Sequence, residues 1–89
     1  MKYVVVYDIS DTKRRNKVSK LLSSYGMRVQ FSCFEIEASL SGVKRIEKEI
    51  SEIIDHDTDR VFIFPISRYV IDMVQKFGVV KELNESTVL

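Results

Sequence analysis

Residues 1–15 read Met-Lys-Tyr-Val-Val-Val-Tyr-Asp-Ile-Ser-Asp-Thr-Lys-Arg-Arg, and this stretch decides the fold. The run from Tyr3 to Tyr7 is β-branched and aromatic, which predicts a strand buried on both faces. Asp8 follows directly, and a carboxylate at the end of a buried strand costs free energy unless it has a partner or a chemical role. Two simpler explanations compete at this point. Asp8 could close the strand as a turn residue, or Asp11 could cap a following helix.

Length and composition limit the function classes. With 89 residues the chain forms one small domain, so association with a second copy is a natural way to bury more apolar surface. Hydrophobic residues make up 45% and charged residues 30%, which is typical of a soluble globular protein. No run reaches the ~20 apolar residues of a membrane-spanning helix, so we expect no membrane partner. Asp8 interrupts the first apolar run, so no signal peptide is expected, and the single Cys33 favours the cytoplasm.

The stretch from Lys13 to Tyr25 predicts the first helix, because its apolar residues recur at helical spacing. Asp11 or Ser10 is expected to cap its start, and Gly26 is expected to end it. The apolar stripe consists of Val18, Leu21, Leu22 and Tyr25.

This helix and the residues after it are basic, although the net charge of the chain is only +1. From Lys13 to Gln30 there is no acid. Like charges three or four residues apart repel, and cations in a first helical turn oppose the helix dipole. The pattern therefore fits a phosphate-facing surface at least as well as an ordinary solvated face. The six cations are Lys13, Arg14, Arg15, Lys17, Lys20 and Arg28.

The remaining elements complete an alternation of strands and helices. Residues 27–38 predict two short antiparallel strands with a tight connection at Phe31 and Ser32. Glu35 and Glu37 share one strand face and are expected to be solvated. Residues 41–54 predict a second amphipathic helix, whose inward stripe consists of Val43, Ile46, Ile50, Ile53 and Ile54.

Residues 60–66 predict a fourth strand, and Pro65 places it at a sheet edge or ends it, because proline cannot donate to a strand ladder. The order strand, helix, strand, strand, helix, strand predicts an α+β fold of the ferredoxin-like type, with both helices on one face of an antiparallel sheet. We expect residues 1–66 to form this core. Residues 67–89 would be a C-terminal extension for dimerisation or partner docking, because the sheet leaves its other face bare. Ser67 to Phe77 fits either a helix or a fifth strand.

Residues 55–59 read Asp-His-Asp-Thr-Asp, which resembles the opening of a calcium-binding loop. The pattern then fails, because Arg60 stands where that loop needs glycine and Ile66 where it needs glutamate. We therefore expect an acidic turn between helix and strand. Cys33 is expected to be a small buried residue, since nothing beside it suggests a reactive thiolate.

Three segments together resemble a known family: Tyr7-Asp8-Ile9-Ser10-Asp11, then Lys13-Arg14-Arg15-x-Lys17-Val18 with Leu21, then Tyr25-Gly26-x-Arg28-Val29-Gln30-x-Ser32-x-Phe34-Glu35. The family is that of the small CRISPR-associated Cas2 proteins. The resemblance is dense over the first forty residues and looser through the fourth strand. Two positions depart from the commonest pattern, Cys33 in place of valine and Pro65 within the fourth strand.

The resemblance implies a ferredoxin-like homodimer with a role in acquiring new spacers for antiviral defence. It implies a magnesium-dependent endonuclease, acting on RNA or on DNA, with Asp8 as the catalytic metal ligand. Nucleic acid would be bound by Lys13, Arg14, Arg15, Lys17 and Arg28, with Tyr7, Ser32 and Phe34 as supporting residues.

The chemistry of the residues agrees with that implication. Magnesium prefers about six oxygen ligands and is usually held by one or two carboxylates together with substrate phosphate. One Asp8 is too little, but two copies related by a twofold axis would suffice. Arg15 and Arg28 are suited to neutralising phosphate oxygens.

Two other function classes compete with the nuclease. The first is a catalytically silent dimer that binds nucleic acid and bridges Cas1-type integrase subunits during spacer integration. This alternative remains close to the nuclease hypothesis, because one acid per chain without a nearby histidine offers few groups for catalysis. The second is a small-molecule regulatory module, which the basic helix disfavours.

Overall fold

The computed structural model describes residues 1–78, and their secondary structure follows the predicted order with one short helix added. The elements are β1 (Lys2–Asp8), α1 (Thr12–Ser23), β2 (Gly26–Gln30), β3 (Cys33–Glu37), α2 (Leu40–Ile53), β4 (Arg60–Ile66) and α3 (Arg68–Ile71). In these described residues, no helix is long and apolar enough to cross a bilayer.

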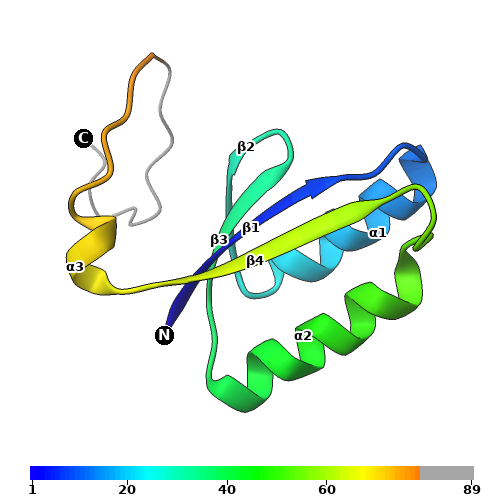
Figure 1. The fold of residues 1–89 in the computed structure, drawn as a ribbon, viewed down its shortest axis with the longest axis horizontal. Helices are drawn as coiled ribbons and strands as arrows, with labels where there is room; N and C mark the ends of the chain where they lie inside the picture. The colour runs from blue at the N-terminus through cyan, green and yellow to red at the C-terminus, as the bar shows by residue number, and fades with distance from the viewer. Residues whose placement is uncertain (79–89) are drawn as a thin grey trace.

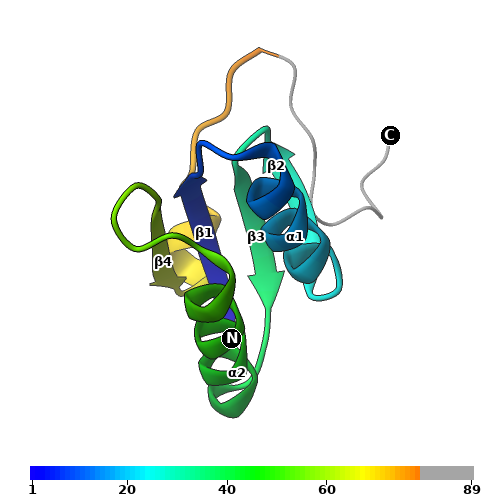
Figure 2. The same cartoon turned by 90° about the vertical axis from the view of Figure 1, so that its right-hand side faces the viewer.

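The four strands form one antiparallel sheet in the order β2-β3-β1-β4. Helices α1 and α2 lie side by side on one face of it (Figures 1 and 2). The predicted α+β fold, with β4 and its Pro65 at a sheet edge, is confirmed. Strand β1 lies between β3 and β4, so its side chains decide what each face of the sheet contains.

Alternation along β1 builds the core on the helix-covered face. Tyr3, Val5 and Tyr7 are buried there, with Val5 paired to Phe34 on β3 and to Ile63 on β4. The helices contribute their predicted stripes to the same cluster, namely Val18, Leu22, Val43, Ile46 and Ile50. Burying apolar side chains of this size stabilises a fold by about 1.5–3 kcal/mol each, so this face supplies most of the folding free energy.

The opposite face of the sheet is open, and the expectation that β1 is buried on both faces is wrong for the described chain. Val6 is 39% exposed, and its neighbours on β4, Phe62 and Phe64, are 54% and 50% exposed. Both helices cover the other face, so nothing from residues 1–78 encloses these rings. An apolar face of this kind is typical of a surface that another chain covers.

The burial of Glu35 differs from the prediction. Its side chain was predicted to be solvated with that of Glu37, but Glu35 is only 9% exposed, whereas Glu37 is exposed. The reason is position in the sheet, because β3 is an interior strand and Glu35 lies between Val4 of β1 and Met27 of β2.

The first helix begins as predicted and ends differently. The Asp11 carboxylate accepts a hydrogen bond from the Arg14 amide at 2.9 Å, which confirms Asp11 as the N-cap. Ser24 is the C-cap, with its amide bonded within the last turn, and Gly26 is already the first residue of β2. Gly26 is required for a different reason, since a Cβ atom there would lie 2.0 Å from the carbonyl oxygen of Glu35.

The segment after β4 begins with the four-residue helix α3 and has neither helix nor strand from there to residue 78. Ser67 caps α3 by accepting a hydrogen bond from the Val70 amide at 3.1 Å, and no further strand forms up to residue 78. Its apolar side chains, including Tyr69 and Phe77, are exposed. The predicted pairing of residues 67–89 with a partner stays a prediction, and residues 79–89 lie outside the described chain.

We predict that Gly26→Ala destabilises the protein by about 2–3 kcal/mol, because the new methyl group forces the β2 and β3 backbones apart. The matched control is Gly42→Ala in α2, where the new Cβ would meet only Ser39 Oγ at 3.2 Å and Ala38 Cβ at 3.4 Å. That variant should stay within about 1 kcal/mol of the wild type. Urea unfolding followed by circular dichroism measures both, and equal midpoints for the two variants would contradict the role given to Gly26.

Candidate metal and nucleic-acid site

Asp8 ends β1 on the open face of the sheet. It has the same strand parity as Val4 and Val6 and is paired in register with Arg60 of β4. The side chain is exposed, and within residues 1–78 no hydrogen bond or ion pair engages its carboxylate. Asp11 caps α1, which confirms the second of the two simpler explanations. Asp8 does not act as a cap within residues 1–78, because its carboxylate accepts no hydrogen bond there. Its oxygens are available to a cation.

One chain alone does not assemble a complete metal site in its described part. No group of three or more His, Cys, Asp or Glu side chains converges there. Asp8 therefore fits Mg²⁺ as a single carboxylate ligand that needs further oxygens from elsewhere. Its position beside the open apolar face is where a second copy of the chain could bring another one.

Two predicted phosphate-binding residues, Arg15 and Arg28, meet around an aromatic ring that the sequence did not single out. The Arg15 Cζ atom lies 5.7 Å from the centroid of the Phe31 ring, and the Arg28 Cζ atom lies 5.8 Å from it. Arg28 also lies over Phe34, at 5.5 Å. These distances are within the range of cation–π attraction.

Hydrogen bonds fix both guanidinium groups. Arg15 donates to the Ile9 carbonyl oxygen at 2.9 Å and to Thr12 Oγ1 at 3.1 Å, while Arg28 donates to Ser19 Oγ. Arg15 is thus attached to the residue directly after Asp8. This bond connects the basic surface to the loop that carries the carboxylate.

Tyr7, Phe34 and Ser32 support this arrangement from within the fold. Tyr7 and Phe34 are both buried on the helix-covered face, with ring centroids 6.3 Å apart, so they lie on the side of the sheet opposite Asp8. The Ser32 carbonyl oxygen accepts a hydrogen bond from the Tyr7 amide at 3.1 Å. The Tyr7 hydroxyl is buried and has no hydrogen-bond partner among residues 1–78.

The other three predicted cations divide into two kinds. Lys13 and Lys17 are exposed on α1, and the structure records no ion pair for either within its described range. Arg14 instead forms an ion pair with Asp59, and two of its guanidinium nitrogens are engaged there, Nε at 2.8 Å and Nη2 at 3.3 Å.

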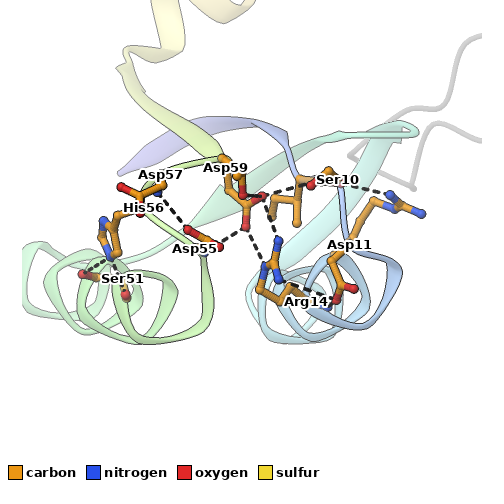
Figure 3. A network of polar contacts seen from close by, with 11 residues as sticks. Ser10, Asp11, Arg14, Ser51, Asp55, His56, Asp57 and Asp59 are labelled. Atoms are coloured by element: carbon orange, nitrogen blue, oxygen red, sulfur yellow. Dashed lines mark hydrogen bonds and ion pairs between the residues drawn. The ribbon is translucent and has the colours of Figure 1, made fainter.

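Asp59 is the residue that sequence reasoning missed. Its side chain is fully enclosed and also accepts hydrogen bonds from the amides of Asp55, at 2.9 Å, and Ser10, at 3.4 Å (Figure 3). It therefore ties the β1–α1 loop to α1 and to the start of β4. The sequence contained a hint of this contact. Antiparallel pairing of Asp8 with Arg60 places Asp59, one residue earlier, next to the loop that follows Asp8.

The predicted acidic turn is confirmed around this network. The Asp59 and Thr58 amides both donate to the Asp55 carbonyl oxygen, and His56 Nε2 donates to the Ser51 carbonyl oxygen at 2.8 Å. Cys33 is half-buried, and burial, together with the charge of Glu35, raises the pKa of its thiol, which disfavours a reactive thiolate.

Ion pairing perturbs both members of the Arg14–Asp59 pair. The hydrogen bond from Arg14 holds the pKa of the Asp59 carboxyl well below its usual value, and the same bond raises the pKa of Arg14. Both groups therefore stay charged at neutral pH. The ion pair connects α1 to the turn that precedes β4.

The family model of CRISPR associated protein Cas2 matches residues 1–74. The protein of Rhodospirillum rubrum named CRISPR-associated endoribonuclease Cas2 4 is 50% identical over 64 residues, which cover 72% of this chain and 52%, about half, of that relative.

Two solved structures share the fold. The crystal structure of Streptococcus pyogenes Cas2 at pH 6.5 superposes with a TM-score of 0.82 at 30% identity, covering 88% of this chain and 100% of that one. A chain of a partial Cas6-RT-Cas1–Cas2 complex superposes with a TM-score of 0.72 at 29% identity, covering 99% of this chain and 98% of that one.

We predict that Asp59→Asn lowers the melting temperature by several degrees at pH 7, because the amide keeps the shape but not the charge that Arg14 needs. A depressed folded-state pKa stabilises the fold above the unfolded value of about 3.9, and this stabilisation is lost as pH falls below it. The gap between the melting temperatures of wild type and variant should therefore shrink as the pH falls from 5 toward 2, because the stabilisation is lost as the pH falls toward the lowered pKa of Asp59. Thermal unfolding across this range measures it.

The control is Asp57→Asn in the same turn, since the Asp57 side chain is exposed and accepts no bond within the described residues. It should match the wild type at every pH. A gap for Asp59→Asn that does not change with pH would contradict the ion pair as its cause.

Proposed function

The chain belongs to the Cas2 family of CRISPR-associated proteins, and we propose that it is a magnesium-dependent endonuclease that hydrolyses RNA phosphodiester bonds and takes part in spacer acquisition. The observation that carries the proposal is Asp8, an exposed carboxylate without a partner among the described residues, held at the end of the central strand. The name of the Rhodospirillum rubrum relative supports RNA as the first substrate to test. Duplex DNA is the second.

The active species in this proposal is a homodimer joined through the open face of the sheet. Val6, Phe62 and Phe64 are exposed there, and solvent contact with side chains of this size is unfavourable. A twofold axis through this face would bring two Asp8 carboxylates into one site, because Asp8 has the parity of Val6. The extension after Ile66 would cover the rest of the partner's face.

The two Asp8 carboxylates would hold Mg²⁺, with substrate phosphate supplying further oxygens. When bound, the ion supplies Lewis acidity toward the scissile phosphate and favours deprotonation of the attacking water. Exposure of Asp8 leaves room for the water ligands that magnesium retains. The hydrogen bond that Arg15 donates to the Ile9 carbonyl oxygen and the one that the Ser10 amide donates to Asp59 fix the loop that follows Asp8.

Phosphate binding is assigned to the cations of α1 and β2. Lys13 and Lys17 attract the backbone electrostatically, while Arg15 and Arg28 are held in place and keep N–H groups for phosphate oxygens. Arg14 adds charge to this surface, but its pairing with Asp59 makes positioning of the loop its main role.

A second candidate function rests on the likeness to the chain in the Cas6-RT-Cas1–Cas2 complex. The dimer would then bridge Cas1-type integrase subunits and hold duplex DNA without cutting it. The same basic surface serves both functions, so only cleavage separates them.

Asp8→Asn separates the two functions, because it keeps size and most hydrogen bonding but removes the charge that the metal needs. We expect the variant to fold, dimerise and bind nucleic acid, while magnesium-dependent RNA cleavage falls by orders of magnitude. The measurements are cleavage of labelled RNA with and without Mg²⁺ and binding in EDTA.

The control is Asp57→Asn, which removes an exposed carboxylate from the acidic turn and should leave cleavage unchanged. Undiminished cleavage by purified Asp8→Asn would reject the metal-nuclease proposal. A wild type that binds duplex DNA but cuts nothing in any divalent metal would reject the nuclease and favour the bridging function instead.

A further inference from the structure

Phe31 occupies an unusual place for an aromatic residue. It lies in the two-residue turn between β2 and β3, where small polar residues and glycine are the usual choice, and it is 69% exposed. The ring lies outside the core that includes Tyr7 and Phe34, so within residues 1–78 the aromatic and cation–π contacts of this ring are those with two arginines. An exposed ring at this position is able to contact another molecule.

The ring is surrounded by positive charge from two different elements. Arg15 of α1 and Arg28 of β2 have their Cζ atoms 5.7 and 5.8 Å from its centroid, and both side chains are fixed by bonds to Ile9 and Ser19. Phe34 is a useful contrast, because Arg28 lies at a similar 5.5 Å from it but the ring is only 1% exposed. Phe31 is therefore the ring of this cluster that a ligand can reach.

We infer that Phe31 is a stacking platform for one unpaired nucleobase of a bound strand, with Arg15 and Arg28 binding the phosphates beside that base. This inference rests on the proposed nucleic-acid function and specifies its substrate. Proteins that bind single strands place aromatic rings next to cations in this way, because every free base offers a π face. Bases inside a duplex are already stacked and offer no such face.

The inference gives the basic surface a preference for single-stranded segments, without a preference for base or sugar. Stacking on the ring reads only the π face, so RNA and DNA strands bind alike at this position. The phosphate contacts supply the salt-dependent part of the affinity, whereas the ring supplies a part that salt does not screen.

The test compares Phe31→Leu, which keeps an apolar side chain but removes the π face, with Phe31→Tyr, which keeps the ring. A labelled single strand of about 12 nucleotides and the same strand annealed to its complement are titrated in EDTA, so that nothing is cut. Phe31→Leu should weaken single-strand binding about 5- to 100-fold, leave duplex binding unchanged and keep the salt slope. Phe31→Tyr should match the wild type for both probes.

Lys17→Ala tests the underlying function separately, and it should lower the log–log salt slope by about 0.7 for the single strand and 0.9 for the duplex. The inference alone would be overturned if the wild type binds, Lys17→Ala lowers the salt slope as expected, and Phe31→Leu binds the single strand as tightly as the wild type. Equal weakening of both probes, or a shift of Phe31→Leu to monomer in sedimentation, would also overturn it, the latter by assigning the ring to a second copy of the chain. A wild type that binds neither probe would overturn the proposed function and the inference together.

Discussion

The rest of the structure depends on which residues of β1 face the helices and which face the opposite side of the sheet. Because side chains alternate along a strand, Tyr3, Val5 and Tyr7 face the helices while Val6 and Asp8 face the other way. The first set builds the core that keeps the sheet folded. The second set leaves an apolar surface with a carboxylate at its end, which is the combination that a twofold metal site needs. A shift of register by one residue would exchange the two faces and remove both features.

The ion pair between Arg14 and Asp59 helps to fix the loop that follows Asp8. The Asp8 side chain makes no hydrogen bond or ion pair within the described residues, so its position depends on the pairing of its backbone with Arg60 and on the loop that follows it. Ser10 of that loop donates to Asp59, and the Ile9 carbonyl oxygen accepts from Arg15. In the proposed function the basic helix has two roles, because Arg14 and Arg15 fix the loop while the exposed lysines of α1 would bind phosphate.

Much of the fold could be predicted from the sequence, because periodicity reports which residues meet the core. The helical spacing of Val18 and Leu22 located α1, and Pro65 placed β4 at an edge. Asp8 and Arg15 were singled out by type and position, and their roles at a metal and nucleic-acid site stay predictions. Their prediction required only that a strand end in an acid and a helix begin with cations.

The missed features are contacts between segments far apart in the chain, which periodicity does not encode. Gly26 was read as a helix stop, although what it avoids is the backbone of β3. Glu35 was expected in solvent, although its strand is interior to the sheet. Asp59 and Phe31 looked like loop residues, and only the tertiary structure brings them to Arg14 and to the Arg15–Arg28 pair.

The central claim is that two Asp8 carboxylates, one from each chain, share one metal ion. Counting bound Mn²⁺ by electron paramagnetic resonance, with sedimentation to establish the dimer, tests it most directly. The account predicts about one bound ion per two chains at saturation, and loss of that ion in Asp8→Asn. One ion per chain, or full Mn²⁺ binding by Asp8→Asn, would contradict it.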